Sequence, residues 1–257
     1  MPAIRQQLLR DPTFGHFPNN CFKNMDPKRL PTRLDHDGLN NAIVIVNFST
    51  NYNEPFLVKT LIDHNSSIMV DEDLVQIPDP KGDKNNPQYL LANSVYRLQI
   101  TSASILFNFT RQYTLWVNYL PFIKSCLDIL SNYIVCHSAQ INYISGFENV
   151  SIFDNIDGSI SLNYLPRFAG SEFKFSCQVN EKRDHRKLES MASIRITDNI
   201  MTGPESTTSI VDISLSGGVK PDSNIIEYID FLHHHQKNLF FLIVKSQFVD
   251  SLGAHYE

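Results

Sequence analysis

Three consecutive histidines, His233, His234 and His235, are the most conspicuous group of side chains that could bind a metal or carry a proton. Successive side chains on a helix point in different directions, so three adjacent histidines cannot reach one metal ion. Asp230 and His234 do have the spacing that brings two ligands to one face of a helix. Two ligands alone make a weak metal site, and we expect an exposed or half-buried helical surface instead.

The charged residues Lys174, Arg195 and Asp212 form the candidate ligand-binding site. Each lies on the polar face of a segment that alternates between apolar and polar residues, as a half-buried strand does. If these strands are neighbours, the three side chains line one surface of the sheet. A solvated sheet face with weak cross-strand charge pairs is the simpler interpretation, and we favour it.

The motifs of common enzyme and cofactor sites do not occur in the sequence. It contains neither of the glycine-rich loops that hold nucleotide phosphates, nor the Gly-x-Ser-x-Gly turn of hydrolases. Ser216-Gly217-Gly218 is better explained as a turn between a strand and a helix. We therefore predict no catalytic residues and no cofactor.

The four cysteines are widely spaced and lack the grouping of a zinc site: Cys21, Cys126, Cys136 and Cys177. Because Cys126 and Cys177 occupy apolar positions of a helical and a strand pattern, we expect buried free thiols and no bound metal.

The aromatic residues Tyr113, Trp116 and Tyr119 could stack on nucleic-acid bases. The formal net charge of −5, from 22 basic and 27 acidic residues, argues against nonspecific nucleic-acid binding. Without a basic surround, packing in the core or at a helix start explains these rings better.

Hydrophobic periodicity predicts the elements that must position these residues. An apolar run over 39–49 indicates a strand covered on both faces. Proline, glycine and charged residues mark 71–93 as a mobile surface loop. A short helix is expected over 54–63. A stripe at intervals of three and four predicts a helix over 120–130, with Pro121 in its first turn. The same spacing predicts a long C-terminal helix that begins near Asp222 or Ser223 and buries one seam: Ile225, Ile229, Leu232, Gln236, Leu239 and Ile243. Further strands are expected at 95–101, 105–110, 134–145, 173–179, 194–196 and 211–215.

These elements predict an α+β fold, an antiparallel sheet with helices packed on one face. Residues 1–29 have no sustained period and form an N-terminal extension, while residues 30–257 form a single α+β domain. We expect residues 1–24 to be dispensable for folding, with Met25 as a candidate translation start. The apolar runs are too short to cross a bilayer, and no secretory signal is visible, so we expect a cytoplasmic protein.

Two segments carry a resemblance to a known family. Residues 30–34 (LPTRL) and 39–49 (LNNAIVIVNFS) are similar to the opening of a sporadically distributed family of uncharacterised bacterial proteins. The segment Ile210–Ile213, the later His233, Lys237, Phe240 and Phe241, and the terminal His255-Tyr256-Glu257 resemble its closing pattern. The resemblance covers about 30–257, and Asn41 and Asn47 depart from its more charged first strand. The scattered distribution of the family implies defence-associated gene neighbourhoods.

Two functions remain open at this point. The absent motifs and the family resemblance favour a non-enzymatic interaction or sensor subunit. A bacterial antiviral defence complex is one assembly to which such a subunit could belong. Such a subunit requires a protein partner or a second copy of the chain. The alternative is an enzyme, a nuclease or hydrolase, whose dispersed site forms only in the fold.

Overall fold

The computed structural model describes residues 31, 33–34, 38–77, 89–110, 115–157, 173–182, 189–203, 206–219 and 223–256. The chain divides into two compact units. Unit 2 comprises residues 40–143 and 216–233, and unit 1 comprises 1–39, 144–215 and 234–257. Four elements contribute residues to both units: β2 (Leu39–Thr50), of which only Leu39 belongs to unit 1, β7 (Ile134–Glu148), β10 (Ser206–Gly218) and α4 (Ile225–Ile243).

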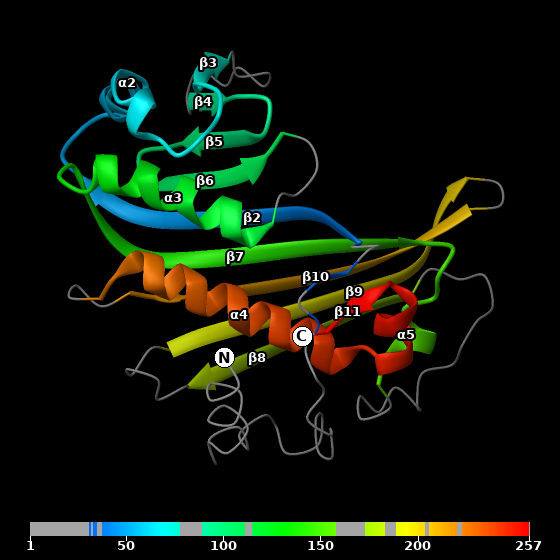
Figure 1. The fold of residues 1–257 in the computed structure, drawn as a ribbon. Coiled ribbons are helices and arrows are strands. Elements are labelled where there is room, and N and C mark those ends of the chain that lie inside the picture. The colour runs from blue at the N-terminus through cyan, green and yellow to red at the C-terminus, as the bar shows by residue number, and fades with distance from the viewer. Residues whose placement is uncertain are drawn as a thin grey trace. The chain divides into compact units, whose positions relative to one another are not determined.

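Unit 2 is built on strands that follow one another in the hydrogen-bonded order β3-β4-β5-β6-β2-β7 (Figure 1). The pairs β3/β4, β4/β5, β5/β6 and β6/β2 are antiparallel. The bounds are β2 (Leu39–Thr50), β3 (Val75–Ile77), β4 (Tyr89–Ala92), β5 (Tyr96–Ile100) and β6 (Ser104–Phe109).

Helix α3 (Trp116–Leu130) covers the apolar face of these strands. The ring of Phe122 stacks on Tyr96 of β5 with centroids 4.1 Å apart. Tyr119 is buried, and its hydroxyl lies 3.4 Å from the carbonyl oxygen of Ala42 in β2. Pro121 lies in the second turn, not in the first as the sequence predicts, and leaves the carbonyl of Val117 without an intrahelical donor. Val117 is exposed, so water can satisfy that carbonyl.

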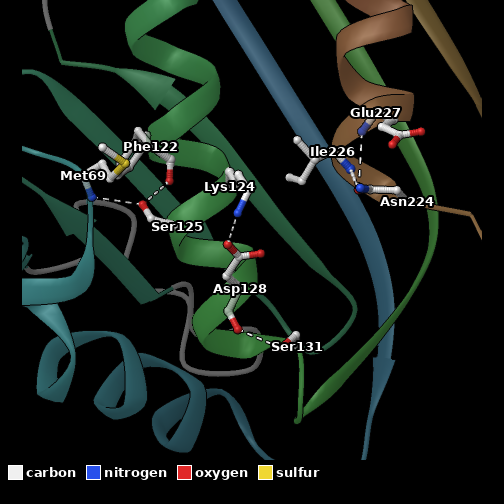
Figure 2. A network of polar contacts seen from close by, with 9 residues as sticks. All are labelled: Met69, Phe122, Lys124, Ser125, Asp128, Ser131, Asn224, Ile226 and Glu227. Atoms are coloured by element: carbon white, nitrogen blue, oxygen red, sulfur yellow. Dashed lines mark hydrogen bonds and ion pairs between the residues drawn. The ribbon is translucent and has the colours of Figure 1, made fainter.

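Helix α2 (Glu54–Asp63) has the bounds expected from the sequence. Asn53 caps its N-terminus, since its side-chain oxygen accepts a hydrogen bond of 3.1 Å from the Phe56 amide. A short 3₁₀ turn (Asn65–Ser67) follows. The Met69 amide then donates to the hydroxyl of Ser125 at 3.1 Å, which fastens this segment to α3 (Figure 2).

Unit 1 contains strands in the order β7-β10-β9-β8, where β9 is Glu189–Gly203 and β8 is Phe173–Lys182. Strands β8 and β9 are antiparallel. Alternate residues of β9 and β10 are buried, as the period-two pattern predicts: Ala192, Ile194, Ile196, Val211, Ile213 and Leu215. Helix α5 (Ser246–Ser251) and a two-stranded pair of β1 (Arg33–Leu34) with β11 (Ala254–His255) also belong here.

Mostly antiparallel strands with a few helices make this an α+β protein, as expected. Helix α4 is followed by α5 and β11 before the chain ends. In the part of the chain that the structure describes, no helix has the length and apolar character needed to span a membrane. The predicted extension, residues 1–29, lies outside the described residues.

Two predictions about local structure are wrong. Strand β2 is not covered on both faces, because Ala42, Val44 and Val46 are buried whereas Asn47 and Ser49 are exposed. The segment 71–93 is not a loop throughout, since it contains the paired strands β3 and β4. Leu74 and Leu91 are fully buried there, while residues 78–88 lie outside the described part.

Candidate functional site

The structure brings together two of the three residues of the predicted ligand site. Arg195 of β9 and Asp212 of β10 form an ion pair with a nitrogen–oxygen distance of 2.6 Å. The backbone of Lys174 lies opposite Thr197 in the β8/β9 register, but its side chain is outside the described part. The side chain of Arg195 is 61% exposed and that of Asp212 is 14% exposed. An ion pair with one exposed partner contributes little to stability, about 1 kcal/mol or less.

Asp212 has a second feature, since its Oδ1 atom is buried and meets no hydrogen-bond donor among the described residues. A buried carboxylate oxygen without a donor is costly. A water molecule or the donor group of a ligand would satisfy it. The Arg195–Asp212 pair is thus compatible with both interpretations of the sequence, and the ligand site stays a prediction.

The histidine cluster differs from the expectation of an exposed or half-buried surface. His234 is exposed, but His233 and His235 are buried. Asp230, the suggested metal partner of His234, instead accepts a hydrogen bond of 2.7 Å from the indole nitrogen of Trp116. Among the described residues, no group of three or more histidine, cysteine and acidic side chains could hold a metal ion.

Unit 2 contains a compact group of four side chains, here called the His233 cluster: Trp116, Tyr143, Asp230 and His233. The Tyr143 hydroxyl lies 2.7 Å from Nδ1 of His233. The imidazole stacks on the Trp116 ring, with centroids 4.1 Å apart and planes inclined by 10°. His233 is only 8% exposed. This arrangement shields the ring from water and gives Nδ1 a directed hydrogen bond.

Local structure explains why these side chains meet. Asp230 and His233 are three residues apart on α4 and therefore share one side of the helix. Asn224 caps this helix: its side-chain oxygen accepts from the Ile226 amide at 2.9 Å and from the Glu227 amide at 3.5 Å (Figure 2). Tyr143 lies on the buried side of β7, and Trp116 is the first residue of α3. The prediction that Trp116 and Tyr119 pack at a helix start and in the core is confirmed, while Tyr113 is outside the described residues.

Asp198 of β9 is a second buried polar centre, in unit 1. It is almost fully buried and accepts hydrogen bonds from the Ser151 hydroxyl at 2.7 Å and from the Ile152 amide at 2.8 Å. The Ser209 hydroxyl lies against the same carboxylate and 2.6 Å from the Val150 carbonyl. Donors of the chain itself surround this carboxylate, so it ties the segment after β7 to β9 and β10.

Three aromatic rings lie close together at the start of α2, here called the α2 aromatic patch: Tyr52, Phe56 and Tyr133. Tyr52 stacks on Phe56 with centroids 4.5 Å apart and an angle of 19°. Tyr133 meets both rings by its edge, at 5.3 and 5.2 Å. Tyr52 is 45% exposed and Phe56 is 37% exposed. Val135, two residues beyond Tyr133, is exposed as well. Sequence periodicity did not reveal this patch, because its members come from separate elements.

The described cysteines are poor nucleophiles. Cys126 is buried, as its position in the helical stripe predicts, and burial raises its pKa far above the ordinary value. Burial also raises the pKa of Cys136 to about 11. Both thiols are therefore protonated at neutral pH. The side chains of Cys21 and Cys177 are outside the described part.

Comparison with known proteins identifies no family for this chain. The chain matches no protein-family model, and no curated protein matches it. The resemblance seen over 30–257 therefore remains a prediction.

Proposed function

We propose that this chain is a non-enzymatic subunit that binds a protein partner through the α2 aromatic patch. The observation that carries the proposal is the exposure of two stacked rings, Tyr52 and Phe56, on a well-anchored helix start. Aromatic side chains are enriched at the centres of protein interfaces, where they contribute much of the binding energy.

The patch is held in place before any partner arrives. The Thr50 hydroxyl donates to the carbonyl oxygen of Tyr133 at 2.6 Å, which joins the end of β2 to the start of β7. The Asn53 cap fixes the first turn of α2 that carries Phe56. Side chains that are already ordered lose less conformational entropy on binding, so such a patch supports tighter binding than a flexible one.

The partner should present an apolar surface of matching size, because the exposed members of the patch, Tyr52 and Phe56, are aromatic. We expect this partner in the cytoplasm. The family resemblance favours a component of a bacterial antiviral defence complex. A second copy of the chain is the other possible partner.

The test is affinity purification of the full chain at native expression, with mass spectrometry, followed by titration of the purified partner. The variants Tyr52→Ala and Phe56→Ala should each weaken binding at least about 10-fold, the scale of a residue central to an interface. Met201→Ala in unit 1 is the control, because Met201 is also exposed and apolar but lies in another unit. Thermal unfolding should show all three variants folded.

Two results would contradict the proposal. Equal binding by wild type and by both aromatic variants would exclude the patch as the binding surface. Failure of the wild-type chain to retain any partner or second copy at native expression would remove the interaction function itself.

A further inference from the structure

His233 occupies a position in which one proton changes its hydrogen-bonding role. In a neutral imidazole one nitrogen accepts and the other donates, so the Tyr143 hydroxyl can donate to Nδ1 across 2.7 Å. When the ring takes a second proton, both nitrogens become donors. The hydroxyl can then no longer donate to Nδ1. Histidine is the side chain whose ordinary titration falls between pH 5 and 8.

The groups around the ring determine where a protonated His233 would find a counter-charge. From α3 it faces the uncharged ring of Trp116, with Tyr119 behind it, and from β7 it faces Tyr143. On its own helix the acidic Asp230 lies three residues earlier and the basic Lys237 four residues later, and the adjacent His234 is exposed. A buried cation requires a charged partner, and in this group Asp230 supplies the negative charge.

We propose that the His233 cluster is a proton-sensitive contact between α3, α4 and β7. At neutral pH, Tyr143 binds His233 while Trp116 binds Asp230 and stacks on the imidazole. Protonation draws the ring along α4 towards the Asp230 carboxylate and away from Tyr143. The Asp230 carboxylate then accepts from both the imidazolium and the indole N–H, so the hydrogen bond between α4 and Trp116 weakens.

Trp116 provides the readout, because it is the single tryptophan of the chain. Its indole ring touches the imidazole directly, so its fluorescence should follow the state of this contact. We expect the emission of the full-length protein to change with pH as a single-proton transition between pH 5 and 8. The imidazole C–H resonances of His233 in an NMR titration should follow the same curve.

Four variants distinguish a proton-sensitive contact from a merely structural one. His233→Gln should abolish the fluorescence transition, while His234→Gln, which changes the exposed neighbour, should leave it unchanged. Asp230→Asn removes the charge that favours the imidazolium, so the midpoint should fall by roughly one pH unit, the scale of a neighbouring charge. Tyr143→Phe removes the donor that stabilises the neutral ring, so the midpoint should rise.

The opposite signs of the last two shifts make the proposal refutable even if one variant folds poorly. A wild-type protein whose tryptophan emission and His233 resonances stay constant from pH 5 to 8 would overturn it. A transition that survives in His233→Gln, or a midpoint that does not fall in Asp230→Asn, would overturn it as well.

Discussion

Replacing Asp198 with alanine should destabilise unit 1 far more than any surface change of the same kind. The carboxylate accepts hydrogen bonds from Ser151, Ile152 and Ser209, and the residue is 2% exposed. Alanine leaves the buried Ile152 amide without an acceptor and removes the partner of the Ser151 hydroxyl, whereas the Ser209 hydroxyl can still donate to the Val150 carbonyl. Hydrogen bonds to a charged group contribute roughly 1.5–3 kcal/mol each and do not add fully, so we expect a loss of about 3–5 kcal/mol.

Urea unfolding followed by circular dichroism measures this loss. Asp198→Asn should cost only about 1–2 kcal/mol, because its side-chain oxygen can still accept from the Ile152 amide and a serine hydroxyl can turn to accept from its NH₂ group. The matched control is Asp128→Ala, which removes an exposed i,i+4 ion pair with Lys124 (Figure 2). That pair should contribute less than about 0.5 kcal/mol. If Asp198→Ala costs no more than Asp128→Ala, the buried network does not stabilise the fold as argued.

Four further predictions concern other parts of the chain. Gly38→Ala should destabilise by about 1–3 kcal/mol in urea unfolding, since the added Cβ would lie 2.5 Å from a ring carbon of Phe147; no loss would mean that the ring moves freely. Asn53→Ala should cost about 1 kcal/mol by loss of the α2 cap, and Asn53→Ser should restore most of it. Alkylation of Cys136, followed by mass spectrometry of its peptide, should be slow at pH 7 and accelerate as the pH approaches about 11; fast labelling at pH 7 would contradict its burial. Burial raises the pKa of Tyr228 from 10.0 to about 12. The stability that the protonated Tyr228 side chain contributes to the folded protein is therefore complete below pH 10 and is lost as the pH rises to about 12. Tyr228→Phe should flatten the fall in the free energy of unfolding over that interval.

The elements with a strong local signal could be predicted from the sequence. Helix α2 has the expected bounds, and the hairpin of β5 and β6 turns where expected, with the Thr101 amide bonded to the Ser104 carbonyl. Alternation in β9 and β10 indicated which residues are buried. In these cases the pattern that defines the element is contained within a few consecutive residues.

Strands β3 and β4 show where such reasoning fails. They are three and four residues long, and the segment between them contains proline, glycine and charged residues. Strand β4 pairs with β5, whose Leu98 lies opposite Leu91, and β3 pairs in turn with β4. Short strands of this kind follow from tertiary contacts, which override local composition.

The same limit applies to the candidate sites. The alternation of apolar and polar residues predicted that Arg195 and Asp212 lie on polar strand faces. Because β9 and β10 are neighbours in the sheet, the two side chains form an ion pair. No local pattern, however, could show that His233 is buried. Its hydrogen-bond partner Tyr143 is 90 positions away along the chain, and a histidine beside a helical stripe is polar in any hydropathy pattern.

The burial of α4 explains why an apolar stripe alone misidentifies its histidines. The predicted seam does turn inward at Ile229, Leu232 and Gln236, but Tyr228, His233 and His235 beside it are buried as well. A helix that is covered over more than one narrow face must bury some of its polar flanks, and each buried polar group then needs a partner. The informative residue on such a helix is therefore the polar one at the edge of the seam. At position 233 that edge residue is a histidine, whose hydrogen-bonding role changes when it takes up a proton.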